Sequence, residues 1–394
     1  MNAKAFSLLL GLAALAAVGA YFIALKPAAT PPGPPAAPGS APTSTAEARL
    51  APALAERAED IATITISSGD TDPVVLTRDP DRENDGWLLA SKANFPAEPD
   101  RVRQLITTLS ELRTVEPKTA KPELHDRLAV QWPDPQKEAA ERDPDDFSPR
   151  PTLVSITDAD GEPIAEIVLG ETTYAGGGPR QYARLLTDNQ SWLVSASVTI
   201  PRGPLGFVNT RFVELPRDSV KSVTITHPNS ETLQLTRDDP DADFTVANLP
   251  EGATMKNQAL ANNTGNALAF VNFTDISLRS GVTDVGGSGN PIPAGSTIAE
   301  YNTFDGRTVT LAIQPERSEA GAAEPSWVSV IDATGDHRDE VLQRFATNII
   351  SFKLPAGTIE SLTRKPSELI QTPATDNTDP TTDNTPGLPP PTYD

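Results

Sequence analysis

The sequence predicts an α+β protein in which an N-terminal transmembrane helix precedes two tandem repeated modules, each built of β-strands, one helix and a β-meander. Three observations lead to this prediction. Residues 5–25 are apolar and carry no charge, strand-like patterns recur through residues 61–361, and these patterns occur twice in the same order. Alternation of apolar and polar residues is typical of half-buried strands, whereas the helical period marks one segment in each module.

With 394 residues the chain has room for several domains. Its composition divides it into a transmembrane signal anchor at residues 1–26, a Pro/Ala-rich linker at 27–55, an α+β module at 56–200, a bridge at 201–216, a second module that repeats the first at 217–362, and an acidic, Pro-rich disordered tail at 363–394. Segments rich in Pro and polar residues have little apolar surface to bury, so we expect the linker to be an extended spacer.

The apolar run Ala5–Leu25 contains 21 residues, with Lys4 before it and Lys26 after it. A helix of that length spans about 31 Å, enough for a hydrocarbon core of about 30 Å. The apolar region of a cleaved signal is usually about 7–15 residues long, so the sequence favours an uncleaved anchor. A signal peptide cleaved at small residues after Ala28 is the alternative. The positive charge before the run indicates a cytoplasmic N-terminus, with the bulk of the chain outside.

The first module opens with strands and a helix. Residues 61–66 alternate apolar and polar side chains, and further strands are expected at 74–76 and 86–89. A helix is predicted to begin near Pro99. Its apolar side chains share one face: Val102, Leu105, Ile106, Leu109 and Leu112.

A polar, Pro-rich insert at residues 116–151 follows the helix, and its acidic composition indicates a solvated loop. A β-meander then completes the module. Its strands are expected at residues 153–157, 164–169, 182–186 and 192–194. The Asp160-Gly161 pair between the first two strands predicts a tight hairpin turn.

The second module repeats these blocks. Ile64 corresponds to Val223, and Leu76-Thr-Arg-Asp79 corresponds to Leu235-Thr-Arg-Asp238, at a constant offset of 159 residues. A helix is expected within residues 255–271. The second meander is predicted at residues 298–303, 309–313 and 327–331, with its own Asp305-Gly306 turn. Several matching blocks in one order are typical of an internal repeat.

The ends of the two modules also match. Residues 207–216 lead into Val220-Lys-Ser222, and residues 345–355 lead into Ile359-Glu-Ser361. This match at the module edges adds to the evidence for an internal repeat.

Composition narrows the classes of function. The chain has 53 acidic and 32 basic residues, a formal charge of −21, so nucleic acid is not an expected partner. It has no cysteine, which excludes disulfides, cysteine-ligated zinc, iron–sulfur clusters and a lipoprotein lipid anchor.

Candidate chemical residues are isolated. His125, His227 and His337 lie far apart, so we interpret them as structural or solvated rather than as zinc ligands. The glycines at 176–178 and 286–289 lack the following Lys-Ser or Lys-Thr of a phosphate loop and are expected to form turns.

The acidic groups offer no clear metal site. The pair Asp145-Asp146 and the set Asp238, Asp239, Asp241 and Asp243 supply oxygen ligands of the kind calcium prefers, but the glycine and terminal glutamate of a calcium loop are missing. Solvated acidic turns are the favoured interpretation.

Serine chemistry has no support either, because Ser219 and Ser222 stand outside any Gly-x-Ser-x-Gly elbow. Arg78 and Arg237 occupy equivalent positions in the two modules. Cross-strand pairing with an acidic neighbour is the favoured explanation, and a shared ligand site is the alternative.

The sequence therefore gives no catalytic, cofactor-binding or metal-binding residue, and we expect a protein that is not an enzyme and has no cofactor. Trp87, Trp192 and Trp327 lie in strand patterns and are expected in the core rather than on a glycan-binding face.

Several motifs resemble the bacterial domain-of-unknown-function 4340 family: Leu76-Thr-Arg78, Pro149-Arg-Pro151, Asp158-Ala-Asp-Gly161, Leu169-Gly170, Tyr182-Ala-Arg184 and Trp192-Leu-Val194. The resemblance covers roughly residues 55–360. It implies a membrane-anchored protein that faces the periplasm, with some relatives associated with ABC-type transport systems of the kind linked to gliding motility. It carries over no catalytic residue.

Together these features predict a single-pass protein of the bacterial inner membrane with the bulk of the chain in the periplasm. We expect it to act by protein–protein interaction, with an integral-membrane partner of the ABC-transporter type. The alternatives are a periplasmic hydrolase of envelope polymers, which needs two acids in one cleft, and a glycan- or lipid-binding protein.

Overall fold

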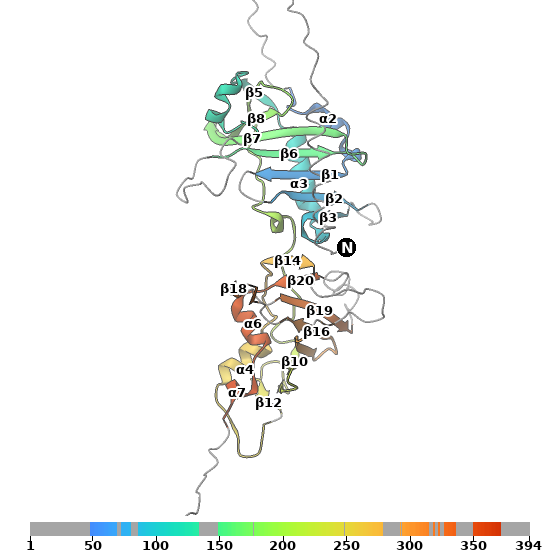
Figure 1. Ribbon diagram of the computed structural model, residues 1–394, viewed down its shortest axis with the longest axis vertical. Coiled ribbons are helices and arrows are strands. Elements are labelled where there is room, and N and C mark those ends of the chain that lie inside the picture. The colour runs from blue at the N-terminus through green and yellow to red at the C-terminus, as the bar shows by residue number, and fades with distance from the viewer. Residues whose placement is uncertain are drawn as a thin grey trace, which may run out of the picture. The chain divides into compact units, whose positions relative to one another are not determined.

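The computed structural model describes residues 48–68, 72–79, 86–133, 149–175, 177–247, 249–278, 292, 294–314, 318–319, 322–323, 327–335 and 350–371. All of them belong to the compact unit Ala46–Asp394, and they form the predicted α+β fold, rich in strands (Figure 1). No helix in this part of the chain has the length and apolar character needed to cross a bilayer. The predicted span at residues 5–25 lies outside the described residues.

The first sheet has nine strands in the order β4-β3-β2-β1-β6-β7-β8-β9-β5. Their bounds are β1 (Thr63–Ser68), β2 (Val74–Arg78), β3 (Trp87–Leu89), β4 (Phe95–Ala97), β5 (Thr114–Pro117), β6 (Thr152–Thr157), β7 (Pro163–Ala175), β8 (Gly178–Leu185) and β9 (Trp192–Val194). Each strand that the sequence predicts in this half is present, although β7 and β8 are longer than expected.

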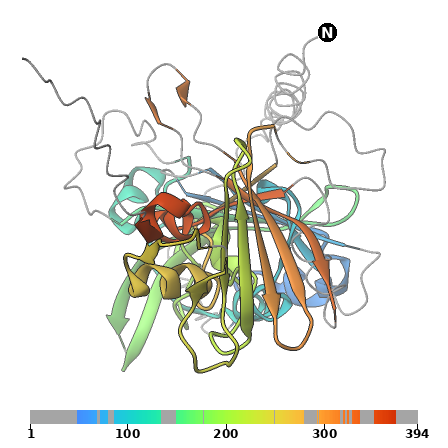
Figure 2. The same ribbon diagram turned by 90° about the horizontal axis from the view of Figure 1, so that it is seen from below.

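The second sheet has eight strands in the order β12-β11-β10-β15-β16-β19-β20-β14 (Figure 2). Their bounds are β10 (Val220–Thr226), β11 (Thr232–Thr236), β12 (Thr245–Val246), β14 (Asp275–Leu278), β15 (Thr297–Thr303), β16 (Thr308–Ile313), β19 (Trp327–Thr334) and β20 (Ile350–Lys353). Two small ribbons accompany it: β13 (Thr254–Met255) with β21 (Ile370–Gln371), and β17 (Ser318–Glu319) with β18 (Ala322–Ala323).

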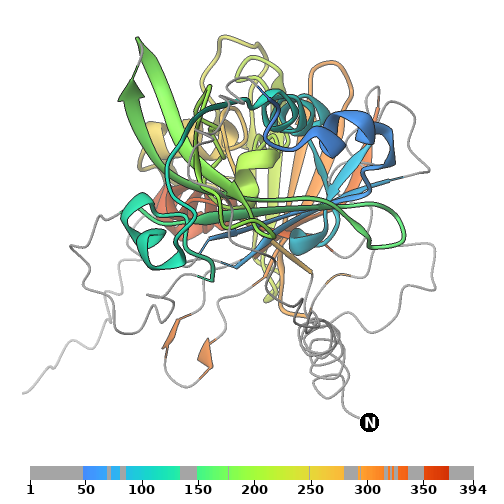
Figure 3. The ribbon, with the colours of Figure 1, turned by 90° about the horizontal axis from the view of Figure 1, so that it is seen from above.

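The described helices are short. They are α2 (Pro52–Glu56), α3 (Pro99–Glu111), α4 (Gln258–Gly265), α6 (Ala356–Leu362) and α7 (Pro366–Leu369). Figure 3 shows α2 (blue) and α3 (teal) together on one side of the first sheet.

The two sheets share one strand order. Read from β3 to β5 and from β12 to β14, they connect their strands in the same sequence along the chain, with α3 and α4 at matching points. The registers agree where the sequence blocks match, because Ile64 pairs with Leu76 and Val223 pairs with Leu235, all four fully buried. The predicted superposition of the two modules stays a prediction.

Helix α3 begins at Pro99, as predicted, because proline suits the first helical turn, where its missing N–H costs no hydrogen bond. Val102, Leu105 and Leu109 are buried against the first sheet. Helix α4 is shorter than the predicted 255–271 segment. Asn257 caps its start by accepting a hydrogen bond from the Leu260 N–H, and turns follow Gly265.

The prediction that the insert 116–151 is a solvated loop holds for only some of the residues that the structure describes. Many of residues 118–133 are exposed, but Val130 is buried and joins a cluster with Leu153 and Val168. The buried Arg184 guanidinium holds the insert, because its Nε donates to the Val130 carbonyl at 2.7 Å. Residues 134–148 lie outside the described residues.

The two sheets meet in a buried aromatic cluster of Phe95, Phe212, Phe273 and Phe352. The Phe352 ring centroid lies 5.7 Å from that of Phe95 in the first sheet, 5.3 Å from Phe212 and 5.1 Å from Phe273. All four rings are at most 2% exposed. A single core therefore runs through both halves.

Beyond β20, two segments of similar sequence have different conformations. Ile359-Glu-Ser361 matches the start of strand β10 in sequence, but it lies in helix α6. A strand needs a partner strand with free hydrogen-bonding groups. Here the segment packs instead on α4, so tertiary context decides its conformation.

Candidate interaction site

A groove runs between α3 and the segment that follows β9. We call it the α3 groove; it has a volume of about 450 Å³. Its lining residues are Arg101, Gln104, Leu105, Thr108, Ser197, Val198, Thr199, Pro201 and Gly206. The four helical residues are spaced by three, four and seven positions, so they share one face of α3.

The far wall of the groove is held by Gln181 of β8, which is buried. Its side-chain amide nitrogen donates to the Gly170 carbonyl at 2.9 Å, and its amide oxygen accepts the Val198 N–H at 3.0 Å. One side chain therefore ties β7, β8 and the groove wall together. A buried amide with both ends bonded fixes its neighbours, which makes the groove preformed.

The near wall is held by Arg101. Its Nη1 donates to the Gly206 carbonyl at 2.6 Å, and its Nε lies 2.5 Å from Oε2 of Glu98. The Glu98 N–H in turn donates to the Phe207 carbonyl at 2.8 Å. The start of α3 and the loop at 201–207 are thereby joined.

A hairpin rises beside the groove. Beyond Leu169, β7 has no pairing with β6, and before Gln181, β8 has no pairing with β9, so residues 170–175 and 178–180 form a two-stranded ribbon (Figure 3). The Thr172 hydroxyl lies 3.0 Å from that of Ser197 in the groove wall. Tyr174 is two residues further on, hence on the same strand face, and is 85% exposed.

The chemistry of the groove is that of recognition. Its lining offers hydroxyls, one amide and one guanidinium, over a floor formed by the buried Leu105 and Val198. None of the lining residues is acidic. Such a surface can donate hydrogen bonds to carbonyl and carboxylate oxygens of a bound chain.

A second hollow, of about 550 Å³, is charged. It is lined by Arg57, Glu59, Asp60, Ile61, Ala62, Arg78, Asp158, Ala159 and Asp160. The Nη2 of Arg57 lies 2.6 Å from Oδ2 of Asp158. Desolvation is the largest single influence and raises the pKa of Asp158, but the hydrogen bonds from Arg57 and from the Glu162 and Asp160 N–H groups together outweigh it and leave that pKa below its usual value. The ion pair fastens the N-terminal segment of the described chain to the β6–β7 turn.

A third hollow, of about 330 Å³, has mostly small apolar lining: Ala51, Pro52, Ala53, Pro163, Ile164, Ala165, Glu166, Leu185 and Thr187. This hollow lies between α2 and the start of β7, and Glu166 is the one acidic residue in its lining.

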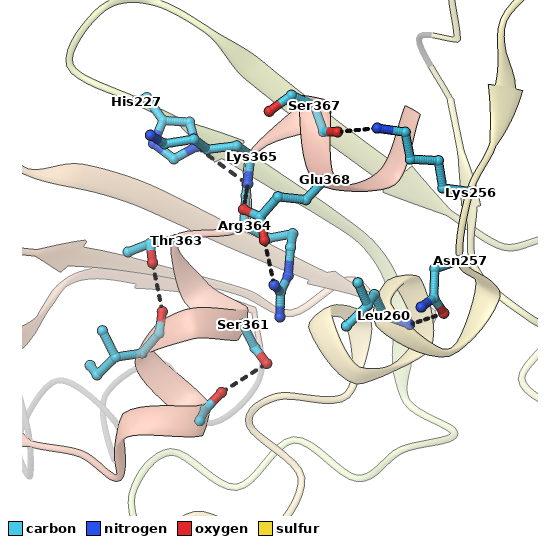
Figure 4. Close-up of polar contacts among 12 residues, drawn as sticks. His227, Lys256, Asn257, Leu260, Ser361, Thr363, Arg364, Lys365, Ser367 and Glu368 are labelled. Carbon is cyan, nitrogen blue, oxygen red and sulfur yellow. Dashed lines mark hydrogen bonds and ion pairs between the residues drawn. The ribbon is translucent and has the colours of Figure 1, made fainter. Parts of the chain in front are cut away.

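The histidines occupy structural positions where they are described. His125 is buried, and its Nε2 donates to the Asn189 carbonyl at 2.8 Å. His227 is also buried. Its Nε2 donates to the Arg364 carbonyl at 3.2 Å, which ties the β10–β11 turn to the segment before α7 (Figure 4). His337 lies outside the described residues.

The acidic pairing predicted for Arg78 and Arg237 is wrong for Arg237. Its guanidinium is buried and donates to the carbonyls of Val220 and Pro240, each at 2.7 Å, and of Arg217. It also stacks 4.5 Å from the ring centroid of Phe244. Burial lowers its pKa. In the first half, Arg78 donates to the Glu59 carbonyl at 2.7 Å and lies over the Trp87 ring.

The acidic residues act locally. Oδ1 of Asp239 accepts the Asp241 N–H at 3.0 Å, and Oδ1 of Asp243 accepts from Nδ2 of Asn262 at 2.7 Å. Across the described residues, no set of three His, Asp or Glu side chains gathers as a metal-binding group. Asp145-Asp146 and the glycines at 286–289 lie outside them.

The remaining singled-out residues are also dispersed. Ser219 donates to the Pro216 carbonyl at 2.7 Å, and Ser222 pairs with Thr236 in the second sheet. Trp87 is buried, as predicted, whereas Trp192 and Trp327 are half-buried.

Sequence reasoning missed the groove. Its key residues carry weak signals: Gln181 is a polar residue inside a strand pattern, and Tyr174 is an aromatic next to a glycine run. A buried glutamine and an exposed aromatic are each unusual, but only the folded chain reveals which they are.

Neither the curated proteins nor the solved structures include a match to this chain. A protein-family model does match, over residues 87–285, which run from β3 of the first sheet past β14 of the second. This match covers half of the chain. The chain therefore belongs to the family described as Domain of unknown function (DUF4340).

Proposed function

We propose that this chain is a single-pass protein of the bacterial inner membrane whose two periplasmic modules, copies of one unit, bind an integral-membrane partner of the ABC-transporter type. It acts by binding and not by catalysis. The observation that carries the proposal is the buried aromatic cluster that joins the two sheets.

A hydrophobic core shared by both halves supports a binding role, because it holds the two halves together as one folded unit. Truncating or separating either half would expose Phe95 or Phe352, which are now at most 1% exposed. The ion pair between Lys92 and Asp275, at 2.7 Å, lies at the same junction. A platform whose two halves keep a fixed relation can present a surface to a partner without losing the entropy of ordering them.

Tethering supports the choice of a membrane partner. The apolar run at residues 5–25 suits an anchor, and the first described residue is Ala48. A Pro-rich spacer of roughly 20 residues reaches about 60–70 Å, since it extends about 3.1 Å per residue. A body so confined meets other membrane proteins at high effective concentration.

The anchor is tested by fractionation. The full-length protein should stay with membranes after a high-salt wash, because an apolar span is not held by screened charges. A protein beginning at Ala46 should be soluble and folded. Recovery of the full-length product as a soluble periplasmic protein that starts beyond Ala28 contradicts the anchor.

The partner is tested by in-cell photocrosslinking. A crosslinking residue placed at Tyr174 or Leu278, which are 85% and 62% exposed, should trap an integral-membrane protein. The anchor fused to an unrelated domain is the control and should trap none. Recovery of soluble periplasmic proteins alone, or turnover of an envelope polymer by the purified body, overturns the proposal.

A further inference from the structure

We propose that the α3 groove is a binding site for acidic, Pro-rich peptide and that its occupant is the chain's own segment 372–394. This inference rests on the groove and on the composition of that segment, and it does not depend on the membrane partner. Residues 372–394 contain four aspartates and six prolines and no Lys or Arg.

Charge selects this groove among the three hollows. The charged hollow contains four carboxylates against two arginines and the apolar one contains Glu166, whereas the lining of the α3 groove has no acid, and its one cation, Arg101, already pairs with Glu98 beside the groove. Arg202, which is exposed, directly follows the lining residue Pro201. In a chain of formal charge −21, a surface of this kind is where an acidic segment meets least repulsion.

Backbone chemistry gives a second match. Pro-rich sequence favours the polyproline II conformation, whose exposed carbonyls accept hydrogen bonds and whose rings pack on aromatic side chains. The groove supplies donors from Gln104, Ser197 and Thr199, and Tyr174 stands on the ribbon beside it. The segment contains Pro389-Pro390-Pro391 and the dipeptide Asp379-Pro380.

The groove is preformed, which lowers the cost of binding. Gln181 holds one wall and Arg101 the other through bonds of 2.6–3.0 Å. An extended, stiff ligand and a rigid groove lose little conformational freedom on binding.

The segment is also long. It follows Gln371, the last residue of β21, and its 23 residues can span about 70 Å at about 3.1 Å each. Being attached to the same chain, it also acts at an effective concentration of about a millimolar.

The absence of cysteine makes a direct test practical. In the full chain, Thr199→Cys with Thr381→Cys pairs the groove wall with the middle of the segment. Ser277→Cys with Thr381→Cys is the control, because Ser277 is exposed in the half from which the segment emerges. We expect oxidation to form the groove disulfide within one chain, at least about fivefold faster than the control disulfide.

Charge variants sharpen the test. Arg202→Glu should reduce the groove disulfide roughly fivefold, as should replacing Asp376, Asp379 and Asp383 by Asn. Arg103→Glu is the matched control. Arg103 is exposed on the same helix, pairs with Asp100 at 2.6 Å and does not line the groove, so the yield should not change.

A synthetic peptide of residues 372–394 should compete with the attached segment for the groove and lower the disulfide yield. Equal rates for the groove and control pairs overturn the proposal, as do disulfides that join only two separate chains. Insensitivity to Arg202→Glu, in a variant whose circular dichroism and melting match the parent, overturns it as well.

Discussion

The two halves of the described chain share a strand order but close their sheets differently. In the first sheet, β4 pairs with β3 and adds an outer strand. At the matching point of the second half, β13 pairs with β21, which comes from the end of the described chain. The two halves therefore share the order of eight strands, whereas the partner of the next strand, β4 or β13, differs between them.

The neighbours of each closing strand explain this difference. Strand β4 carries Phe95 into the aromatic cluster, so its position serves the junction between the sheets. Later segments of the chain complete the far end of the second half. There α6, α7 and β21 complete the core through Leu362 and Leu369, both fully buried.

The matching arginines teach the same lesson. Arg78 and Arg237 donate through their backbone N–H to the equivalent carbonyls of Ala62 and Lys221. Their side chains differ, because Arg237 is buried among carbonyls and Phe244, while Arg78 is half-buried beside Trp87. Equivalent sequence positions thus make the same backbone hydrogen bond, but their side chains are expected to contribute differently to the stability of the fold.

The hairpin turns after β6 and β15 are alike in backbone. Gly161 and Gly306 have φ of +82° and +84°, which glycine adopts without strain. Their caps differ: the Asp158 carboxylate accepts the Asp160 and Glu162 N–H groups, whereas the Thr303 hydroxyl oxygen accepts the Arg307 N–H.

The largest effect is expected from breaking the junction. Phe352→Ala should lower the free energy of unfolding by about 3–5 kcal/mol, because a fully buried ring leaves a cavity. Hydrogen exchange should show lost protection in β1 and β2 of the first sheet as well as in the second.

The control for the junction is Leu235→Ala, which removes a buried side chain of the second sheet outside the aromatic cluster. It should spare the first sheet more than Phe352→Ala does. If Phe352→Ala leaves exchange in the first sheet unchanged, the halves are energetically independent and the rigid-platform argument fails.

The closure of the second half is the next target. Leu369→Ala should cost about 2–3 kcal/mol, because Leu369 is fully buried where α7 meets β21. Ser367→Ala, on the exposed side of α7, should stay within about 0.5 kcal/mol. Urea unfolding measures both. Equal effects of the two changes would show that the 356–371 segment contributes little to the second half.

The arginines give a smaller contrast. Arg237→Leu should cost about 2–3 kcal/mol, because it leaves buried carbonyls of Val220 and Pro240 without their donor. Arg78→Leu should cost about 1 kcal/mol, since that side chain is half-buried. Thermal unfolding of both variants compares them, and a reversed order would contradict the geometry described.

The sequence predicts the parts of this fold that depend on local pattern. Strand alternation, the Asp-Gly turns and the 159-residue offset locate the strands and their common order, and Pro99 locates α3. It does not settle conformations that depend on distant segments. Val130 of the insert packs against Val168, and Ile359-Glu-Ser361 lies in helix α6 although its sequence matches the start of β10. The groove belongs to this second kind, because Gln181 gains its role only when Gly170 and Val198 meet it.

The smallest effect concerns the turns and depends on pH. Hydrogen bonds from the Thr303 hydroxyl and then from Arg307 lower the pKa of Asp305 from its ordinary 3.8 to about 2. A carboxylate whose pKa is lower in the folded state stabilises the fold above the unfolded value and loses that contribution as pH falls. Asp305→Asn should therefore destabilise at neutral pH, and the difference from the parent should close between pH 4 and about 2.

The magnitude of this effect is small because the Asp305 side chain is 56% exposed and its ion pair with Arg307 is screened by water. We expect less than about 1 kcal/mol at neutral pH. Glu251→Gln, on an exposed turn, makes the same change of charge and should show no such pH dependence. Urea unfolding at a series of pH values distinguishes them. A difference that persists unchanged at pH 2 would mean that Asp305 acts in this turn through packing and not through its charge.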